Sequence, residues 1–447
     1  MRENKNSFYR AVLGLVIPLA LQNLINVGVS AADVFMLGMV GEKSLAACSL
    51  AGQVQYIMTL IFFGMSSGAS VLIAQYWGKG DIKAVERVLG ISVKIGLIVS
   101  AAFTAVTYAF PNEIMHLLTN DEEVIAEGVR YMRIVCWSYV ISSMTMIYLN
   151  TMRSIECVFI STGTYLVSLG VNVLFNAVLI FGLMGLPKMG IGGAALATLI
   201  ARIVEFLIVI VYDRKFNKVF RFNFSFFQKD ALLFKDYVRF SVPVICNELM
   251  WGSGCAIITG IIGHLGSSVT AANSAAQMAR QLAMVLSLGI ANATAIMIGK
   301  VIGEGKMELA REYGRRFLRL SLIMGAVGSV IILTARPILL GAMALTPVAL
   351  EYLSGMMFVM AYFVFFQSYN TVLVVGIFRA GGDTKFGLLI DVGFMWGFSI
   401  VMGAIAAFIW KLPPMIVYML LLSDEVIKVP FSSIRYKQKK WLKNITR

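Results

Sequence analysis

Long apolar stretches alternate with short polar segments along almost the entire chain. A helix needs about 20 mostly apolar residues to cross the hydrocarbon core of a bilayer. About twelve of the stretches reach that length and carry few charges. We therefore predict an all-α integral membrane protein with transmembrane helices near residues 12–40, 46–76, 90–110, 131–152, 159–183, 190–212, 239–262, 269–299, 317–341, 350–377, 386–410 and 414–434.

The composition supports a membrane protein and excludes several classes of soluble protein. Of the 447 residues, 59% are apolar and 14% are charged, whereas a soluble domain is about 25% charged. Too little polar surface remains for a soluble enzyme, a nucleic-acid-binding protein or a secreted disulfide-rich protein. The five cysteines lack C-x-x-C spacing and mostly lie in apolar stretches, so we expect them to be reduced and without a metal.

The basic residues lie mostly in alternate loops, which indicates how the chain is oriented. The net charge is +14, and Lys and Arg gather at the N-terminus, in the segment from Arg214 to Arg239 and in the C-terminal tail. Cytoplasmic loops of membrane proteins carry such an excess. We predict a multi-pass protein of the inner cell membrane with both termini cytoplasmic, a retained first helix and a basic tail beside anionic lipid.

The two halves of the chain repeat each other. A constant offset in sequence position pairs Pro18 with Pro243 and continues through glycine and alanine positions of six spans. Because each half contains six spans, both enter the membrane from the same side. We predict a parallel repeat of two six-helix lobes, an N-lobe over residues 1–220 and a C-lobe over residues 221–447, with a cytoplasmic linker from about 213 to 238. Such duplicated halves around a midplane cavity are typical of transporters that work by alternating access.

Two acidic residues lie deep inside predicted spans. An ionisable group at the bilayer centre costs about 2.5–3.5 kcal/mol on insertion scales, so it is a candidate functional residue. Asp33 in the first span and Glu248 in the seventh have no basic neighbour at helical spacing. The repeat places Ile258 opposite Asp33 and Asn23 opposite Glu248. Since the scaffold is duplicated and the charges are not, we predict that both acids bind an ion or a proton.

Four other charged residues within the spans have less specific interpretations. Arg202 and Glu205 are three residues apart on one helix face, which favours a local ion pair. Asp391 lies a turn or two from Lys385, so it belongs either to the membrane interface or to a cytoplasmic gate. Arg280 is expected to pair with a carboxylate from another helix.

Asn172 and Asn176 are four residues apart and therefore share a face of the fifth span. Their amide oxygens are suitable ligands for a hard cation such as Na⁺, and their amide groups can equally hold a carboxylate or join two helices. The sequence has no nucleotide-binding P-loop and only two histidines, both near span ends. We expect no catalytic activity and no cofactor other than a coupling Na⁺ or H⁺.

Several ordered segments resemble the MATE family (multidrug and toxic compound extrusion) of the MOP flippase superfamily, in its bacterial form. They are IPLALQNLINVGVSAADVFMLGMVGEKSLAA in the first span, IAQYWGKGD after the second, and NVLFNAVLIFGLMGLPKMGIGGAALAT across the fifth and sixth. VPVICNELMWG in the seventh span, IFRAGGDT after the tenth and the terminal DE-x-x-K run complete the set. The resemblance covers nearly the whole chain.

The resemblance implies a V-shaped pair of six-helix lobes that exports cationic or amphipathic compounds in exchange for Na⁺ or H⁺. Asp33 matches the first-helix carboxylate that members use for cation binding, and Pro18 matches a proline at which that helix bends. Asn172 and Asn176 match fifth-helix polar partners of the acid. Glu248 matches the seventh-helix glutamate of the NorM-type branch.

One departure from that branch bears on which acid is coupled to transport. NorM-type members carry a tenth-helix aspartate before the loop equivalent to FRAGG, and residues 365–370 (FFQSYN) contain none. Coupling through Asp33, with Asn172 and Asn176, is therefore favoured over coupling through Glu248.

The leading hypothesis is a multidrug antiporter, and the alternative is a flippase for a lipid-linked oligosaccharide or related lipid. The antiporter needs small cationic or amphipathic substrates and membrane lipid, and no nucleic acid or obligatory protein partner. The flippase needs a strongly cationic cavity for pyrophosphate. Arg280 is the main basic residue within the spans, which counts against the flippase.

Overall fold

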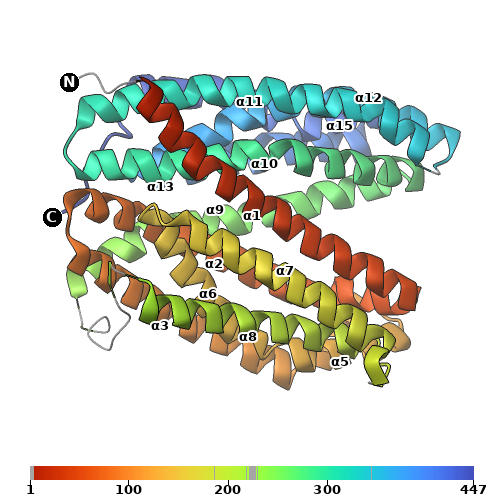
Figure 1. The fold of residues 1–447 in the computed structure, drawn as a ribbon. Helices are drawn as coiled ribbons and strands as arrows, with labels where there is room; N and C mark the ends of the chain where they lie inside the picture. Colours follow the sequence, from red (N-terminus) through yellow and green to blue (C-terminus); the bar gives the residue numbers. More distant parts are fainter. Residues whose placement is uncertain (1–4, 186, 218, 221–227, 229, 344) are drawn as a thin grey trace. The chain divides into compact units, whose positions relative to one another are not determined.

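The computed structural model describes residues 5–185, 187–217, 219–220, 228, 230–343 and 345–447, and every regular element within them is helical (Figure 1). The first half contains α1 (Lys5–Val40), α2 (Glu42–Lys79), α3 (Ile82–Ala109), α4 (Pro111–Leu118), α5 (Glu122–Val135), α6 (Ser138–Ser154), α7 (Val158–Phe181), η1 (Leu183–Gly185) and α8 (Ile191–Lys215). The second half contains α9 (Ala231–His264), α10 (Ser267–Gly303), α11 (Met307–Ala342), α12 (Pro347–Thr371), η3 (Val372–Phe378), α13 (Thr384–Phe394), η4 (Met395–Ser399), α14 (Ile400–Ala404), η5 (Ile405–Ile409), α15 (Pro414–Leu421) and α16 (Asp424–Lys437). The predicted all-α class is confirmed.

The predicted spans agree closely with these helices. Ten helices in the described part of the chain are long and apolar enough to cross a membrane, and α5 with α6 makes an eleventh span that bends by 53°. The predicted tenth and eleventh spans are Pro347–Phe378 and Thr384–Ile409, each joining an α-helix to π-helical turns. The last predicted span, 414–434, is divided between α15 and α16. A layout of twelve transmembrane helices is consistent with this set.

The two interrupted spans break next to a serine. The Ser138 hydroxyl donates to the Val135 carbonyl at 2.6 Å, and the Ser423 hydroxyl donates to the Leu420 carbonyl at 2.6 Å. Such side-chain bonds compete with the helical backbone ladder. Hydropathy averaged over a window does not register them, which is why the sequence predicts one continuous helix at each place.

The described helices form two compact units. Unit 1 comprises Met1–Ala20, Ala74–Gly80 and Val242–Arg447, and unit 2 comprises Leu21–Ile73 and Asp81–Ser241. This division differs from the two lobes predicted from the repeat. Those lobes describe the internal duplication of the sequence, and they remain a prediction.

Two of the unit boundaries fall beside prolines that the repeat pairs. In α1 the boundary lies two residues after Pro18, and in α9 it lies just before Pro243. Proline has no N–H to donate to the carbonyl four residues earlier. Both helices therefore lack one backbone hydrogen bond close to where one unit ends and the other begins.

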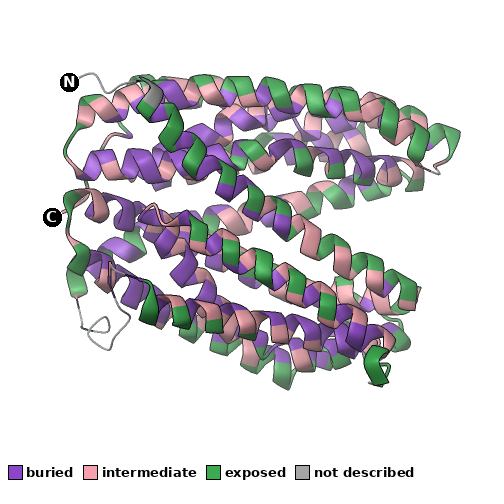
Figure 2. Cartoon of the chain, viewed as in Figure 1, coloured by how far each residue is buried: buried purple, intermediate pink, exposed green. Residues whose placement is uncertain are grey.

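The faces of the helices that point away from each unit are strongly apolar. Buried and exposed positions alternate around the long helices (Figure 2). In the apolar segment of each candidate span, only 28–67% of the residues are buried inside the protein. Phe35, Phe159 and Leu389 are 71%, 75% and 69% exposed. Extended apolar surface of this kind indicates contact with hydrocarbon, as expected for a multi-pass membrane protein.

A close crossing of α2 and α10 within unit 1 explains one pair of repeated glycines. A Cβ on Gly78 would collide with the backbone carbonyl of Lys300, and a Cβ on Gly303 would collide with that of Gln75. The offset that pairs the two prolines also relates Gly78 to Gly303 and Gln75 to Lys300. The two contacts are thus equivalent by the repeat, and each requires a residue without a side chain.

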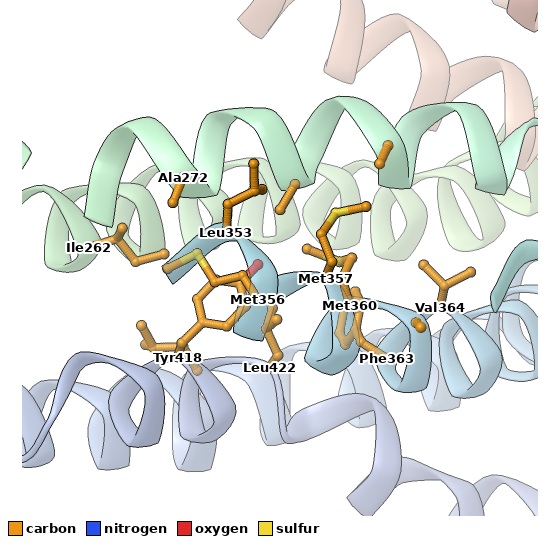
Figure 3. Close-up of a cluster of buried hydrophobic side chains, with 14 of the residues drawn as sticks. Ile262, Ala272, Leu353, Met356, Met357, Met360, Phe363, Val364, Tyr418 and Leu422 are labelled. Atoms are coloured by element: carbon orange, nitrogen blue, oxygen red, sulfur yellow. The ribbon is translucent and has the colours of Figure 1, made fainter. Parts of the chain in front are cut away.

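The core of unit 1 is rich in methionine. Met356, Met357 and Met360 of α12 are fully buried against Ala272 of α10 and Tyr418 of α15 (Figure 3). Methionine is flexible and fills irregular gaps between helices. Many of the methionines that make this sequence so apolar therefore serve packing.

The basic C-terminal tail folds into unit 1. Trp441 is 1% exposed, and its carbonyl lies so close to Gly381 that a Cβ there would collide with it. The Gln75 amide donates to the carbonyls of Ala380 and Lys443, at 2.8 Å and 3.1 Å. The charge pattern predicted a tail beside lipid and did not indicate this docked segment.

Candidate cation-coupling site

Asp33 of α1 and the asparagine pair of α7 meet inside unit 2. The Asn176 amide donates to Asp33 Oδ1 at 2.5 Å and to Asn172 Oδ1 at 3.1 Å. Asn172 and Asn176 are 3% and 0% exposed, whereas Asp33 is half-buried. The helical spacing of the asparagines, one turn apart, lets one amide group bridge the carboxylate and its neighbour.

In the described part of the chain, this arrangement leaves one buried amide oxygen without a hydrogen-bond donor. Asn176 Oδ1 is buried and has no hydrogen-bond partner among the described residues. A buried acceptor without a donor is costly, and carboxylate and amide oxygens are ligands of hard cations such as Na⁺. Asp33, Asn172 and Asn176 therefore fit a Na⁺ ion, and Asp33 alone fits a proton. The described residues contain no group of three or more His, Cys, Asp or Glu arranged to hold a metal ion.

Arg202 is the basic residue whose charge acts on Asp33, but its guanidinium is bound to another carboxylate. Its guanidinium donates to Glu205 Oε1 at 2.6 Å, which makes an ion pair within α8. The Arg202 charge acts on Asp33 at longer range, without a direct bond between the two in the described structure. Asp33 is therefore held by an amide and not by a fixed cation.

Two neighbours of Asp33 were not singled out from the sequence. Cys48 of α2 and Tyr131 of α5 lie within electrostatic range of each other and of Asp33. Tyr131 is 7% exposed. Neither residue is charged, so the free-energy cost of placing a charge inside the bilayer, which singled out Asp33, gives no signal for them. The tyrosine hydroxyl and the thiol place additional polar groups near the carboxylate.

Glu248 of α9 has a basic partner that the sequence analysis did not anticipate. Arg379, which follows η3, donates to Glu248 Oε1 at 2.7 Å, and the two side chains are 5% and 13% exposed. The first half contains a comparable contact, in which Arg153 donates to Gln22 at 3.2 Å. Arg153 and Arg379 are partners in the repeat, with an offset one residue longer than that of the prolines.

Asp391 and Arg280 have partners that the sequence analysis did not name. Asp391 of α13 accepts from Asn247 at 3.1 Å and pairs with Lys428 at 3.2 Å. Arg280 of α10 does not pair with a carboxylate among the described residues. It donates instead to Gln277 Oε1 at 2.6 Å and Gln367 Oε1 at 3.3 Å.

Comparison with known proteins establishes the family. The model of the MatE family matches residues 18–178 and again residues 243–405, which together are well over half of the chain. The chain belongs to the MATE family. The two matches begin at Pro18 and Pro243, the same pair from which the internal repeat was inferred. The protein is thus a member of a family of multidrug efflux transporters, which are membrane proteins and not enzymes.

Relatives at low sequence identity cover most of the chain. The probable multidrug resistance protein YoeA of Bacillus subtilis is 23% identical over 92% of this chain and 89% of its own length. The probable multidrug resistance protein NorM of Rhizobium meliloti is 28% identical over 72% of this chain and 69% of its own length.

Solved structures share the fold at 18% identity. A crystal structure of the Vibrio cholerae MATE transporter VcmN superimposes with a TM-score of 0.88 over 97% of both chains. A MOP superfamily transporter from Pyrococcus furiosus gives 0.86 over 96% of this chain and 95% of its own. That second structure is described as having a binding pocket of reverse polarity that suggests a different function. The shared fold therefore leaves the function to be argued from the site.

Proposed function

We propose that this MATE protein is a secondary active antiporter of the inner cell membrane that exports cationic or amphipathic organic compounds in exchange for Na⁺ or H⁺. The observation that supports it is the Asp33 carboxylate, which accepts from Asn176 and has no ion pair in the described structure. Both termini are cytoplasmic in this proposal, as the distribution of basic residues indicates.

Coupling arises because one carboxylate serves two competing cations. While Asp33 is ionised it favours a positively charged compound nearby, and when Na⁺ or H⁺ occupies it that attraction is lost. Asn172 and Asn176 hold the carboxylate and offer amide oxygens to the incoming ion. One charge that moves across 100 mV releases about 2.3 kcal/mol, which is enough to drive efflux against a gradient.

Pro18 connects this event to a change in helix shape. It lies about four helical turns before Asp33 on the same helix, α1. Since proline leaves a gap in the backbone ladder, α1 is easiest to bend there. Occupation of Asp33 changes the hydrogen bond that ties α1 to α7, and the bend at Pro18 then accompanies alternating access of the two lobes.

Glu248 has a different role in this proposal. Its ion pair with Arg379 neutralises the charge that would otherwise attract an ion. We assign this pair to holding α9 against the end of η3, and we assign ion coupling to Asp33. The missing tenth-helix aspartate agrees with that assignment.

The test is efflux of a fluorescent organic cation from vesicles containing the purified protein. A Na⁺ gradient and a pH gradient are imposed separately, and empty vesicles serve as the control. The proposal expects uphill efflux under at least one gradient. Efflux under neither gradient, together with translocation of a lipid-linked pyrophosphate headgroup, would establish the flippase alternative instead.

A further inference from the structure

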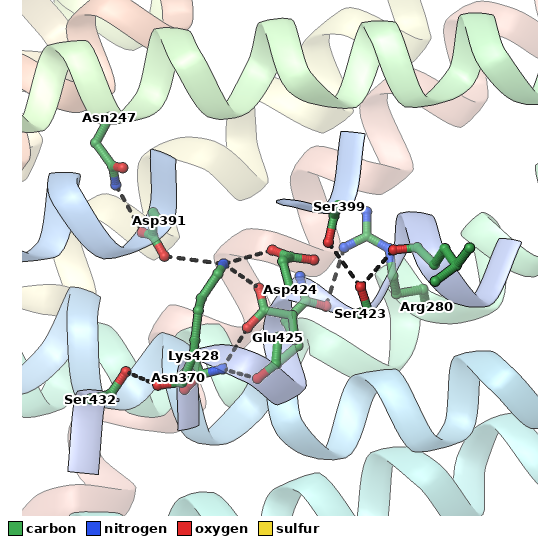
Figure 4. Close-up of polar contacts among 12 residues, drawn as sticks. Asn247, Arg280, Asn370, Asp391, Ser399, Ser423, Asp424, Glu425, Lys428 and Ser432 are labelled. Atoms are coloured by element: carbon green, nitrogen blue, oxygen red, sulfur yellow. Dashed lines mark hydrogen bonds and ion pairs between the residues drawn. The ribbon is translucent and has the colours of Figure 1, made fainter. Parts of the chain in front are cut away.

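A second buried group of charges lies in unit 1, and the proposed mechanism does not use it. Lys428 of α16 is 2% exposed and is bound by three carboxylates (Figure 4). Its ammonium group lies 2.8 Å from Asp424 Oδ2, 3.1 Å from Glu425 Oε1 and 3.2 Å from Asp391 Oδ1. We refer to Lys428, Asp391, Asp424 and Glu425 as the Lys428 cluster.

Two buried amides point into the Lys428 cluster and are only half satisfied. Asn247 of α9 donates to Asp391 Oδ2 at 3.1 Å, and Asn370 of α12 donates to Glu425 Oε2 at 2.7 Å. The two asparagines are 5% and 3% exposed. The Oδ1 atom of each is buried and has no hydrogen-bond partner among the described residues. Each side chain therefore presents an acceptor that lacks a donor or a cation at the edge of the cluster.

The charges of the neighbourhood do not balance. The helices α12, α13, η3 and η4 pack against α16. Cys255 of α9 lies within electrostatic range of both the cluster and Arg280 of α10. Arg280, which among the described residues is bonded only to neutral glutamines, is the positive side chain beside the cluster (Figure 4). Cys255 is a neutral thiol, and Arg379 at the end of η3 is already paired with Glu248. With Lys428 and Arg280 counted against the three carboxylates, one negative charge remains. Burying an uncompensated charge is costly.

We propose that the Lys428 cluster binds one exchangeable monovalent cation, either H⁺ or Na⁺. One such ion neutralises the remaining charge. It also gives a positive partner to an amide oxygen of Asn247 or Asn370, directly for Na⁺ or through a protonated carboxyl group that donates. Lys428 restricts the site to a single charge because its own ammonium already occupies the centre. The site is separate from Asp33 and goes beyond the proposed coupling mechanism.

The site is tested by thermal unfolding of the full-length protein in lipid nanodiscs. All measurements use an Asp33→Asn background, so that binding at Asp33 does not contribute. The melting temperature is recorded in NaCl and in choline chloride of equal ionic strength, from acidic to alkaline pH. If the ion is Na⁺, the melting temperature rises with NaCl at alkaline pH. If the ion is H⁺, it rises as the pH falls without Na⁺, because the folded cluster retains a proton that solvated carboxyls release.

Charge-neutralising variants then locate the response. Asp391→Asn removes the surplus charge, so the cation-dependent rise should be lost, and Glu425→Gln provides the same test if the first variant does not fold. Glu351→Gln is the matched control, because Glu351 is an exposed acid of α12 in the same unit, and it should retain the full response. A parent protein that responds to neither cation overturns the proposal. So does a response that persists in both Asp391→Asn and Glu425→Gln. In either case the assignment of coupling to Asp33 is unaffected.

Discussion

The ion pair between Glu248 and Arg379 distinguishes a structural acid from a coupling acid. The Arg379 side chain is buried, at 5% exposed, and the Glu248 side chain is largely buried, at 13% exposed. Removing one partner of such a pair leaves an uncompensated buried charge and costs about 3–5 kcal/mol, whereas replacing both with neutral groups of similar size is often neutral. We expect Glu248→Gln and Arg379→Met each to lower the free energy of unfolding by about 3 kcal/mol, at the lower end because Glu248 retains some exposure.

The double variant Glu248→Gln/Arg379→Met should recover most of the loss and lie within about 1 kcal/mol of the parent. A double-mutant cycle on unfolding in nanodiscs measures the coupling energy between the two side chains. Ion-driven efflux is measured on the same proteins, and the double variant should still couple efflux to the ion gradient. If Glu248→Gln is as stable as the parent but loses coupling, then Glu248 is a coupling acid and this reasoning is refuted.

Three further predictions concern packing and capping. Gly303→Ala should destabilise unit 1 by about 1–3 kcal/mol, because its Cβ meets the Gln75 carbonyl, whereas Gly260→Ala, which has open space around it, should be tolerated; thermal unfolding compares the two. Trp441→Ala should cost about 3–5 kcal/mol in the same assay, and an unchanged melting temperature would show that the tail does not dock. The Leu233 backbone N–H, more than the guanidinium of Arg87, holds the pKa of Asp230 below its usual value at the start of α9. The ionised Asp230 carboxylate should therefore stabilise the fold at neutral pH, and this stabilisation should disappear as the pH falls through the lowered pKa. Asp230→Asn should remove this acid-dependent loss of stability.

The spans could be predicted from the sequence on physical grounds, and the contact at Asp33 was implied by the resemblance to the MATE family. A bilayer imposes a length and an apolar composition on each helix, so eleven of the predicted spans correspond to helices or to one bent pair. The spacing of Asn172 and Asn176 places both amides on one face of a helix, and the free-energy cost of burying a charge makes Asp33 a candidate functional residue. That the amides meet Asp33 was implied by the resemblance to the MATE family, because the residues alone left open whether they bind a cation, hold a carboxylate or join two helices.

Long-range partners could not be predicted in the same way. Arg379 lies 131 residues from Glu248, and which helix faces meet depends on rotations that periodicity within one helix does not report. The Lys428 cluster shows the same limit. The DE-x-x-K run was visible as a motif, but Asp391 and the two asparagines reach it from α13, α9 and α12. The docked tail depends on Gly381 and Gln75. Neither residue type, read in a sequence, predicts that another segment packs against it.

The central claim is that Asp33 exchanges a coupling ion, and Asp33→Asn tests it most directly. The variant is reconstituted in vesicles beside Glu113→Gln, an exposed acid in the same unit, and both are assayed for ion-driven efflux and for passive exchange of the same fluorescent cation. We predict that Asp33→Asn abolishes uphill efflux under Na⁺ and pH gradients while passive exchange continues, and that Glu113→Gln behaves as the parent. Uphill efflux at the parental rate in Asp33→Asn would contradict the account.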